Sequence, residues 1–272
     1  MTTTEVENFP GFPEGILGPE LMANMRQQAE RMGTETVSAS VTEVDLATRP
    51  FRVTAGDRTE ETRTLIIATG AYAKRLGLPS EAALYGKGVS ACATCDGFFF
   101  RDKRVLVVGG GDAAMEEAVF LTRFASQVTI LVRKDVLKAS KVMEERARKD
   151  PKIEFRWNVE VTEVLGQDEG QMRGVRLRDT RSGETSETEA EGLFVAIGHA
   201  PNTAIFKDQL ELDGRGYIVT KEGTATSVPG VFACGDVQDV RYRQAITAAG
   251  SGCMAALDTQ RFLEEDGTAD GR

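Results

Sequence analysis

The chain has 272 residues, 41% hydrophobic and 28% charged, which is the composition of a globular protein with one large or two medium domains. Its net charge of −9 at pH 7 disfavours nucleic acid or an anionic membrane as a partner, and no run of about 18 apolar residues could span a membrane. The N-terminus lacks the regions of a signal peptide, and four cysteines do not make a disulfide framework, so we expect a cytoplasmic protein.

The first third of the chain predicts a helix followed by strands. Pro19 suits a first helical turn, an apolar stripe follows it, and Gly33 can end the helix. Residues 35–70 then alternate polar and apolar side chains as strands do. A glycine-containing loop over residues 77–88 leads to the first cysteine, Cys92.

From Arg104 onwards the pattern becomes strand–helix–strand. Strands are expected at 105–108, 128–132, 153–157, 160–165, 174–178, 193–197 and 231–234, and helices at 112–125, 140–149 and about 244–263. The character changes near residues 75 and 200. We therefore predict two Rossmann-like α/β domains, each doubly wound and three-layered: a discontinuous one over residues 1–75 plus 201–272, and an inserted one over 76–200.

A glycine-rich run, Gly109 to Ala114, fits the pattern G-x-G-x-x-A directly after a predicted strand and at the start of a predicted helix. In that context the glycines let the backbone approach a pyrophosphate, whose charge lies at the helix N-terminus. We predict a dinucleotide site that includes Gly109, Gly111, Asp112 and Ala113. A glycine turn without a ligand is the alternative.

The end of the next predicted strand indicates which nucleotide binds. An NAD site usually has an acidic residue there, which accepts a hydrogen bond from the ribose 2′-hydroxyl. This strand instead runs into Arg133 and Lys134, with Lys138 close behind. A cationic cluster suits a 2′-phosphate, so the sequence predicts NADPH; solvated surface charges are the alternative.

Cys92 and Cys95 form a C-x-x-C pair, which can form a reversible disulfide and often has a lowered thiol pKa. Two other interpretations are half of a zinc site and an inert buried pair. Zinc would need further ligands from Cys234, Cys253, His199 or a carboxylate, and no second C-x-x-C exists. We expect Cys234 and Cys253 to pack in the core, and a turn role suits His199 at least as well as catalysis.

Gly235 and Asp236 follow a predicted buried strand and place a carboxylate at its C-terminal end, where α/β folds bind ligands. An aspartate in an ordinary turn is the alternative.

Together these runs resemble one family, the low-molecular-weight thioredoxin reductases of bacteria. The matching runs are Thr3–Gly11 (TTEVENFPG), Ala91–Phe99 (ACATCDGFF), Leu193–His199 (LFVAIGH), Val231–Val237 (VFACGDV) and Tyr242–Ile246 (YRQAI). The similarity covers residues from Thr2 to about Leu263.

The resemblance implies a redox-active flavoprotein that passes electrons from NADPH through FAD to Cys92 and Cys95, and then to the disulfide of thioredoxin. Cys95 would face the flavin, Cys92 would react with thioredoxin, and Asp96 would donate a proton. The positions that match flavin contacts are Asn8, Thr69, Gly70, Gly235, Asp236, Arg243, Gln244 and Ala245, and Gly198 matches an NADPH contact. The family also implies a homodimer and a catalytic cycle with two domain orientations.

The sequence departs from the family pattern in two places. Lys134 and Lys138 stand where arginines are usual, which keeps the charge but loses the planar fork. No G-x-G-x-x-G segment for the ADP half of FAD precedes Thr2, so we expect an FAD-binding domain that is incomplete at its N-terminus and weak FAD binding. Met1 would then be an internal methionine or the product of a truncation.

Two further functions are considered beside this one. One is a related disulfide reductase directed at a peroxiredoxin. The other is a non-catalytic remnant that binds NADPH only.

Overall fold

The computed structural model describes residues 5–269, so Met1 and the start of the Thr3–Gly11 run lie outside the described residues. The chain forms two compact units. Of the described residues, the inserted unit comprises Glu5, Val6 and Ala73–His199, and the flanking unit comprises Glu7–Tyr72 and the chain from Ala200 to Ala269. Which nucleotide each unit binds stays a prediction.

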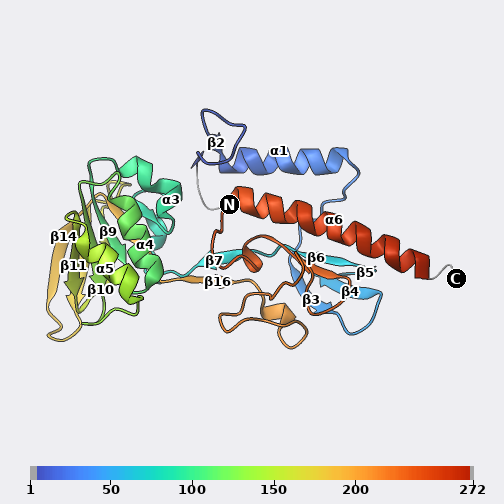
Figure 1. The fold of residues 1–272 in the computed structure, drawn as a ribbon. Helices are drawn as coiled ribbons and strands as arrows, with labels where there is room; N and C mark the ends of the chain where they lie inside the picture. Colours follow the sequence, from blue (N-terminus) through green and yellow to red (C-terminus); the bar gives the residue numbers. More distant parts are fainter. Residues whose placement is uncertain (1–4, 270–272) are drawn as a thin grey trace. The chain divides into compact units, whose positions relative to one another are not determined.

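A five-stranded parallel sheet is the centre of the inserted unit (Figure 1). Its strand order is β11-β10-β9-β15-β8. Its strands are β8 (Val89–Ser90), β9 (Arg104–Val108), β10 (Gln127–Val132), β11 (Ile153–Trp157) and β15 (Gly192–Val195). The helices are α2 (Pro79–Ala83), α3 (Ala93–Asp96), the 3-10 helix η1 (Gly97–Phe100), α4 (Asp112–Leu121) and α5 (Lys141–Lys149). A three-stranded antiparallel sheet follows, made of β12 (Val159–Leu165), β13 (Gly174–Asp179) and β14 (Thr185–Glu189).

Both faces of the parallel sheet are buried, which explains the continuous apolar run of β9. Val105 and Val107 point to one face and pack with Met115 of α4, while Leu106 points to the other and packs with Leu177 of β13. The unit therefore has three layers, with helices on one face and the antiparallel sheet on the other. Sequence patterning did not predict β14, because its side chains are mostly exposed and show no apolar alternation.

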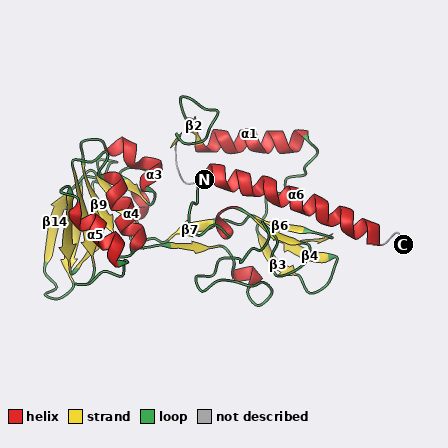
Figure 2. Ribbon diagram, in the orientation of Figure 1, coloured by secondary structure: helices red, strands yellow, loops and turns green. Residues whose placement is uncertain are grey.

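The flanking unit has its own layers (Figure 2). Its elements are β2 (Ile16–Leu17), α1 (Gly18–Arg31), β3 (Val41–Asp45), β4 (Phe51–Ala55), β5 (Arg58–Thr62), β6 (Leu65–Ile67), η2 (Ala204–Phe206), β17 (Val231–Ala233), η3 (Gly235–Val237) and α6 (Ala245–Ala269). The strand β1 (Glu5–Val6) belongs to the inserted unit, and β7 (Ala71–Ala73) and β16 (His199–Pro201) carry the chain between the units. The helices predicted at the two ends of the chain are confirmed by α1 and α6.

A parallel pair, β6 and β17, lies between α6 and the antiparallel sheet β3-β4-β5 in this unit. Phe232 and Cys234 pack with Ala255 of α6, while Val231 packs on the other side with Phe51 of β4. The core position predicted for Cys234 is thereby confirmed. Within residues 5–269, none of the helices combines the length and the apolar content that a membrane span requires.

Leu177 tests the packing of the antiparallel sheet on the parallel one. Its side chain is fully buried, so Leu177→Ala should lower the free energy of unfolding by about 2–5 kcal/mol. Urea unfolding followed by the fluorescence of Trp157, the only tryptophan, measures this change in the same unit. Val142→Ala on the exposed side of α5 is the control and should change stability by less than about 0.5 kcal/mol. Equal losses in both variants would contradict the assigned core.

Candidate functional site

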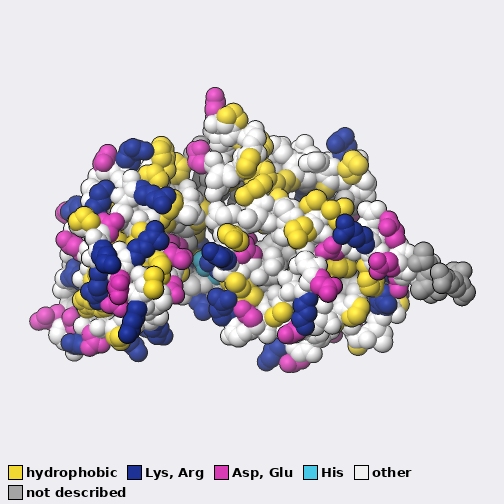
Figure 3. Space-filling model, viewed as in Figure 1, with side chains coloured by type: hydrophobic (Ala, Val, Ile, Leu, Met, Phe, Trp, Pro, Cys, Tyr) yellow, Lys and Arg dark blue, Asp and Glu magenta, His cyan; other side chains and the backbone are white. Residues whose placement is uncertain are grey.

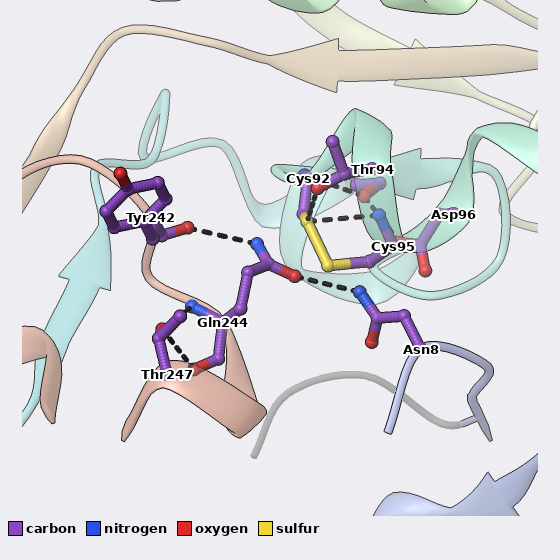
Figure 4. Close-up of a disulfide and its surroundings, with 9 residues drawn as sticks. Asn8, Cys92, Thr94, Cys95, Asp96, Tyr242, Gln244 and Thr247 are labelled. Atoms are coloured by element: carbon purple, nitrogen blue, oxygen red, sulfur yellow. Dashed lines mark hydrogen bonds between the residues drawn. A yellow bond between two sulfur atoms is a disulfide. The ribbon is translucent and has the colours of Figure 1, made fainter. Parts of the chain in front are cut away.

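The redox cysteines lie just after β8, where the chain turns into the short helix α3. Cys92 and Cys95 form a disulfide in the structure, with their Cα atoms 5.3 Å apart (Figure 4). Within residues 5–269, no three His, Cys, Asp or Glu side chains come together in a way that could hold a metal. The zinc alternative therefore finds no ligand set in this part of the chain.

The Cys92 sulfur accepts two hydrogen bonds from its own turn. The Cys95 N–H donates to Cys92 Sγ at 3.2 Å, and the Thr94 hydroxyl lies 3.4 Å from the same sulfur (Figure 4). A disulfide sulfur carries no hydrogen, so Thr94 is the donor. After reduction the same two donors would stabilise a thiolate at Cys92, which is the reactive form of cysteine.

Ser90 joins the cysteine turn to the carboxyl group of Asp96. Its hydroxyl accepts the Cys92 N–H at 3.1 Å and donates to Asp96 Oδ2 at 2.5 Å. Burial raises the pKa of Asp96 above its ordinary value, and the hydrogen bond from Ser90 opposes that shift. Asp96 is therefore suited to hold a proton beside the cysteines at a higher pH than a solvated aspartate would.

The dinucleotide turn connects the end of β9 to α4. Gly109 has φ of +153°, and a Cβ atom there would lie 2.5 Å from the Ala196 carbonyl oxygen and 2.7 Å from the Ala114 Cβ. Only glycine fits this place, so the backbone can approach both β15 and a ligand. Gly111 caps α4, whose first N–H groups point at the space beyond it.

The basic segment, defined as residues 133–138, follows β10 and is hydrogen-bonded to the same turn. The Gly110 carbonyl accepts the N–H groups of Lys138 and Ala139 at 2.6 and 3.1 Å. The Asp112 carboxylate accepts the Ser140 N–H at 2.6 Å. Asp112, predicted as a cofactor contact, thus also fixes the segment that carries the cations.

Arg133 and Lys134 line an open hollow of about 550 Å³. The remaining lining residues are Glu160, Arg178, Asp179, Thr180, Arg181, Ser182 and Gly183. Lys138, predicted together with Arg133 and Lys134, is not among them. On the face shown in Figure 3, Lys and Arg side chains of this unit are interleaved with Asp and Glu, so anion binding depends on such local groups.

In the flanking unit, two pairs of predicted flavin contacts follow neighbouring parallel strands. Ile67 of β6 pairs with Ala233 of β17, so Thr69-Gly70 and Gly235-Asp236 lie at the same edge of the sheet. The Thr69 hydroxyl donates to the Asn202 carbonyl at 2.8 Å, and the Asn202 amide donates back to the Thr69 carbonyl at 2.9 Å.

Asp236, at that edge, has a carboxyl group with a shifted pKa. Burial, followed by the charge of Asp239, raises the pKa of Asp236, and the charge of Arg243 opposes the shift. Within residues 5–269, the Asp236 side chain has no hydrogen-bond partner. A half-buried acceptor without a partner fits a ligand with hydroxyl groups, such as the ribityl chain of FAD.

The carboxylate of Asp239 fixes the backbone that leads into α6. Asp239 accepts the N–H groups of Arg241, Tyr242 and Arg243, each at 2.8 Å, and Arg243 has φ of +50°. The Asn8 amide donates to the Gln244 side chain at 2.9 Å (Figure 4). The predicted contacts Asn8, Arg243, Gln244 and Ala245 therefore meet at the N-terminal end of α6.

A glycine-rich dinucleotide turn in one α/β unit, a polar strand edge in a second unit and a C-x-x-C disulfide define a disulfide oxidoreductase linked to a pyridine nucleotide. A family model described as pyridine nucleotide-disulphide oxidoreductase matches residues 1–252, and the chain belongs to that family.

The relatives narrow the family further. The chain is 56% identical over 265 residues to a thioredoxin reductase of Streptomyces clavuligerus, covering 97% of this chain and 82% of that protein. It is 55% identical over 266 residues to a thioredoxin reductase of Mycolicibacterium smegmatis, covering 97% and 85%. The solved structure of a thioredoxin reductase from Giardia duodenalis superposes with a TM-score of 0.90 at 43% identity, covering 97% and 86%. The predicted family, α/β fold and oxidoreductase function are confirmed.

At two residues the structure differs from what the sequence indicated. The core position predicted for Cys253 is wrong: its side chain is exposed on α6, whereas Ala255, two positions further along the helix, is the residue that packs against β17. Ser90 was missed, although a hydroxyl residue two positions before the first cysteine could have suggested it.

The raised pKa of Asp96 predicts a pH-dependent stability. As pH rises from about 4, the folded chain keeps a proton that the unfolded chain has lost, so the free energy of unfolding falls until pH passes the raised pKa. Asp96→Asn cannot titrate, and the difference between the two chains isolates this group. Urea unfolding from about pH 4 to 8 measures it, and a difference independent of pH would contradict the assignment.

Gly111→Ala tests the dinucleotide turn without disturbing the fold. No atom lies within 4 Å of a Cβ built at Gly111, so the free energy of unfolding should change by less than about 1 kcal/mol. A methyl group there would still obstruct a pyrophosphate at the start of α4. Calorimetric titration should show a rise in the Kd for NADP⁺ of about tenfold or more. An unchanged Kd in the folded variant would contradict the predicted cradle.

Proposed function

We propose that this chain is an NADPH-dependent thioredoxin-disulfide reductase that uses FAD. The observation that carries the proposal is the Cys92–Cys95 disulfide, which lies in one unit with a glycine cradle for a dinucleotide. When bound, NADPH supplies a hydride and FAD transfers two electrons onwards to a disulfide. The residues of the chain would bind these groups, hold the two sulfurs and move protons.

The reduced cysteine pair would act by thiol–disulfide exchange. The Cys92 thiolate attacks one sulfur of the substrate disulfide, and the bond to the other substrate sulfur breaks. The Cys95 thiolate then attacks the Cys92 sulfur, which restores the Cys92–Cys95 bond and releases the substrate sulfur that Cys92 had attacked. Two electrons move to the substrate, and its two sulfurs take up two protons. The Cys95 N–H and the Thr94 hydroxyl support Cys92 as the attacking residue.

Asp96 would supply a proton in this exchange. Burial raises the pKa of Asp96, and the Ser90 hydroxyl connects its carboxyl group to the Cys92 N–H by two hydrogen bonds. The proton would be held at Oδ1 of Asp96, because Oδ2 accepts the hydrogen bond from the Ser90 hydroxyl. A carboxyl group with a raised pKa keeps its proton more often near neutral pH than a solvated one, so it is more often available as a proton donor.

NADPH would bind at the carboxyl end of the parallel sheet. Gly109, Gly111 and Ala113 leave space for the pyrophosphate at the start of α4, and Asp112 fixes the neighbouring segment. Arg133, Lys134 and Lys138 would attract the 2′-phosphate. Gly198 follows β15, the strand that contacts Gly109 through Ala196, and its φ of +101° suits a backbone bend beside a ligand.

FAD would bind at the strand edge of the flanking unit. Asp236 supplies an acceptor for the ribityl hydroxyls, and Thr69, Gly70 and Gly235 form the adjoining backbone. The residues at the start of α6 would lie near the isoalloxazine ring; they are Arg243, Gln244 and Ala245, with Asn8 hydrogen-bonded to Gln244. The N-terminus of this helix would stabilise negative charge on the ring by about 0.3–1 kcal/mol.

A protein substrate is supported by the surface next to the cysteines. Phe98 and Phe99 are 57% and 41% exposed, only a few residues beyond Cys95. Arg101 lies 5.4 Å from the Phe98 ring centroid. Exposed aromatic and arginine side chains are enriched where proteins dock, and thioredoxin is the protein disulfide that the relatives' names indicate.

We also propose a homodimer in the cytoplasm, on the basis of the family resemblance. The exposed thiol of Cys253, which is free in the structure, agrees with a reducing compartment.

The role of Cys92 can be tested without any bound nucleotide. In a Cys253→Ser background, Cys95→Ser keeps Cys92 as a free thiol and Cys92→Ser keeps Cys95. The probe is a thioredoxin with one active-site cysteine, activated as its thionitrobenzoate disulfide. Cys95→Ser should release thionitrobenzoate about tenfold faster or more, and mass spectrometry should show the covalent complex.

A parallel experiment measures turnover. In the chain supplied with FAD, NADPH and thioredoxin, both single variants should lower turnover by about 10³-fold or more, because neither can form the internal disulfide. Equal rates of thionitrobenzoate release would show that Cys92 is not the attacking residue. Full turnover in either variant would contradict the proposed function.

A further inference from the structure

The basic segment after β10 also contains an acid. Asp135 directly follows Arg133 and Lys134. An acidic residue after the second strand of a dinucleotide-binding unit accepts the ribose 2′-hydroxyl of NAD, and it repels the extra phosphate of NADP. A carboxylate at this position therefore opposes the preference that the two neighbouring cations would otherwise impose.

An arginine from another part of the unit neutralises this acid. Arg181, in the turn between β13 and β14, forms an ion pair with Asp135, although 46 positions separate them in the sequence. Arg181 also lines the hollow that contains Arg133 and Lys134. The charge of Asp135 is thus balanced at the wall of the same hollow.

The turn is built in a way that holds Arg181 in place. The Asp179 carboxylate accepts the N–H groups of Arg181 and Ser182 at 2.7 and 2.8 Å. These two bonds, that of Ser182 first, lower the pKa of Asp179 and keep it ionised. The Thr180 hydroxyl donates to the Arg133 carbonyl at 3.1 Å and fastens the turn to the basic segment.

The other cations of the hollow have different partners. Arg178 donates to Glu160 at 2.8 Å from its Nε atom, so its charge is balanced within the sheet. Among residues 5–269, neither Arg133 nor Lys134 forms an ion pair. With Asp135 paired to Arg181, these two cations keep their charge for an anionic ligand.

We propose that Arg181 is a positioning residue for the choice of coenzyme: by holding Asp135 in an ion pair, it removes an acid from the 2′-phosphate site and allows Arg133 and Lys134 to select NADPH over NADH. The inference rests on the proposed NADPH-dependent function and adds a residue outside the dinucleotide motif. Arg181 acts through Asp135 and need not contact the phosphate.

The expected effect is moderate, because both partners are in contact with water. The side chains of Arg181 and Asp135 are 63% and 64% exposed, and solvent screens such pairs strongly. A phosphate carries nearly two negative charges, so an uncovered carboxylate should weaken NADP⁺ binding by about three- to tenfold and leave NAD⁺ binding almost unchanged.

The test measures the Kd values of NADP⁺ and NAD⁺ for the full chain by isothermal titration calorimetry. Arg181→Ala should raise the Kd for NADP⁺ about three- to tenfold and that for NAD⁺ less than about twofold. Adding Asp135→Asn to Arg181→Ala should restore NADP⁺ binding, and Arg181→Lys should retain it. The difference between Arg181→Ala and the double variant should shrink as salt is added, because exposed charges are screened.

Other outcomes overturn the proposal in distinct ways. If Arg181→Ala weakens both nucleotides equally, Arg181 has only a structural role. If Asp135→Asn does not restore binding, Arg181 does not act by covering that acid. If the unaltered chain shows no preference for NADP⁺ over NAD⁺, the proposed NADPH function itself fails, and the Arg181 proposal fails with it.

Discussion

The parallel sheet of the inserted unit is the constraint on which the site depends. Strands that run in the same direction end at the same edge, so the segments that follow them meet there. In this sheet β10, β9, β15 and β8 are consecutive neighbours. The basic segment follows β10, the glycine turn follows β9, Ala196 follows β15, and the cysteine turn follows β8. One rule of sheet geometry thus brings the glycine turn, the basic segment and the disulfide to the same edge.

The loops at that edge are fixed to one another by backbone groups. Gly109 must lack a side chain because the end of β15 lies against it, and Gly110 accepts two N–H groups from the basic segment. Ser90 similarly joins the end of β8 to Asp96. Side chains that could perform chemistry are thereby held on a rigid support, which is the arrangement that precise recognition requires.

Charge at this edge is controlled locally within a protein whose net charge is −9. The acids nearest to Arg133 and Lys134 are balanced by other arginines. Glu160 is paired with Arg178, and Asp135 with Arg181. The flanking unit shows the opposite arrangement, since burial and then the nearby carboxylate of Asp239 raise the pKa of Asp236. The two edges therefore suit different ligand groups: a phosphate in one unit and hydroxyl groups in the other.

The sequence by itself determined the features that are local along the chain. The spacing of Cys92 and Cys95, the glycine run between a strand and a helix, and the cations after the next strand are all contiguous patterns, and the helices at the two ends follow from apolar periodicity. Only the tertiary structure decided the pairings between distant segments. Thr69 and Asn202 are 133 positions apart, Asp135 and Arg181 are 46 apart, and the exposed strand β14 has no apolar alternation. Such contacts depend on which strands become neighbours and in which register, and no pattern within one segment contains that information.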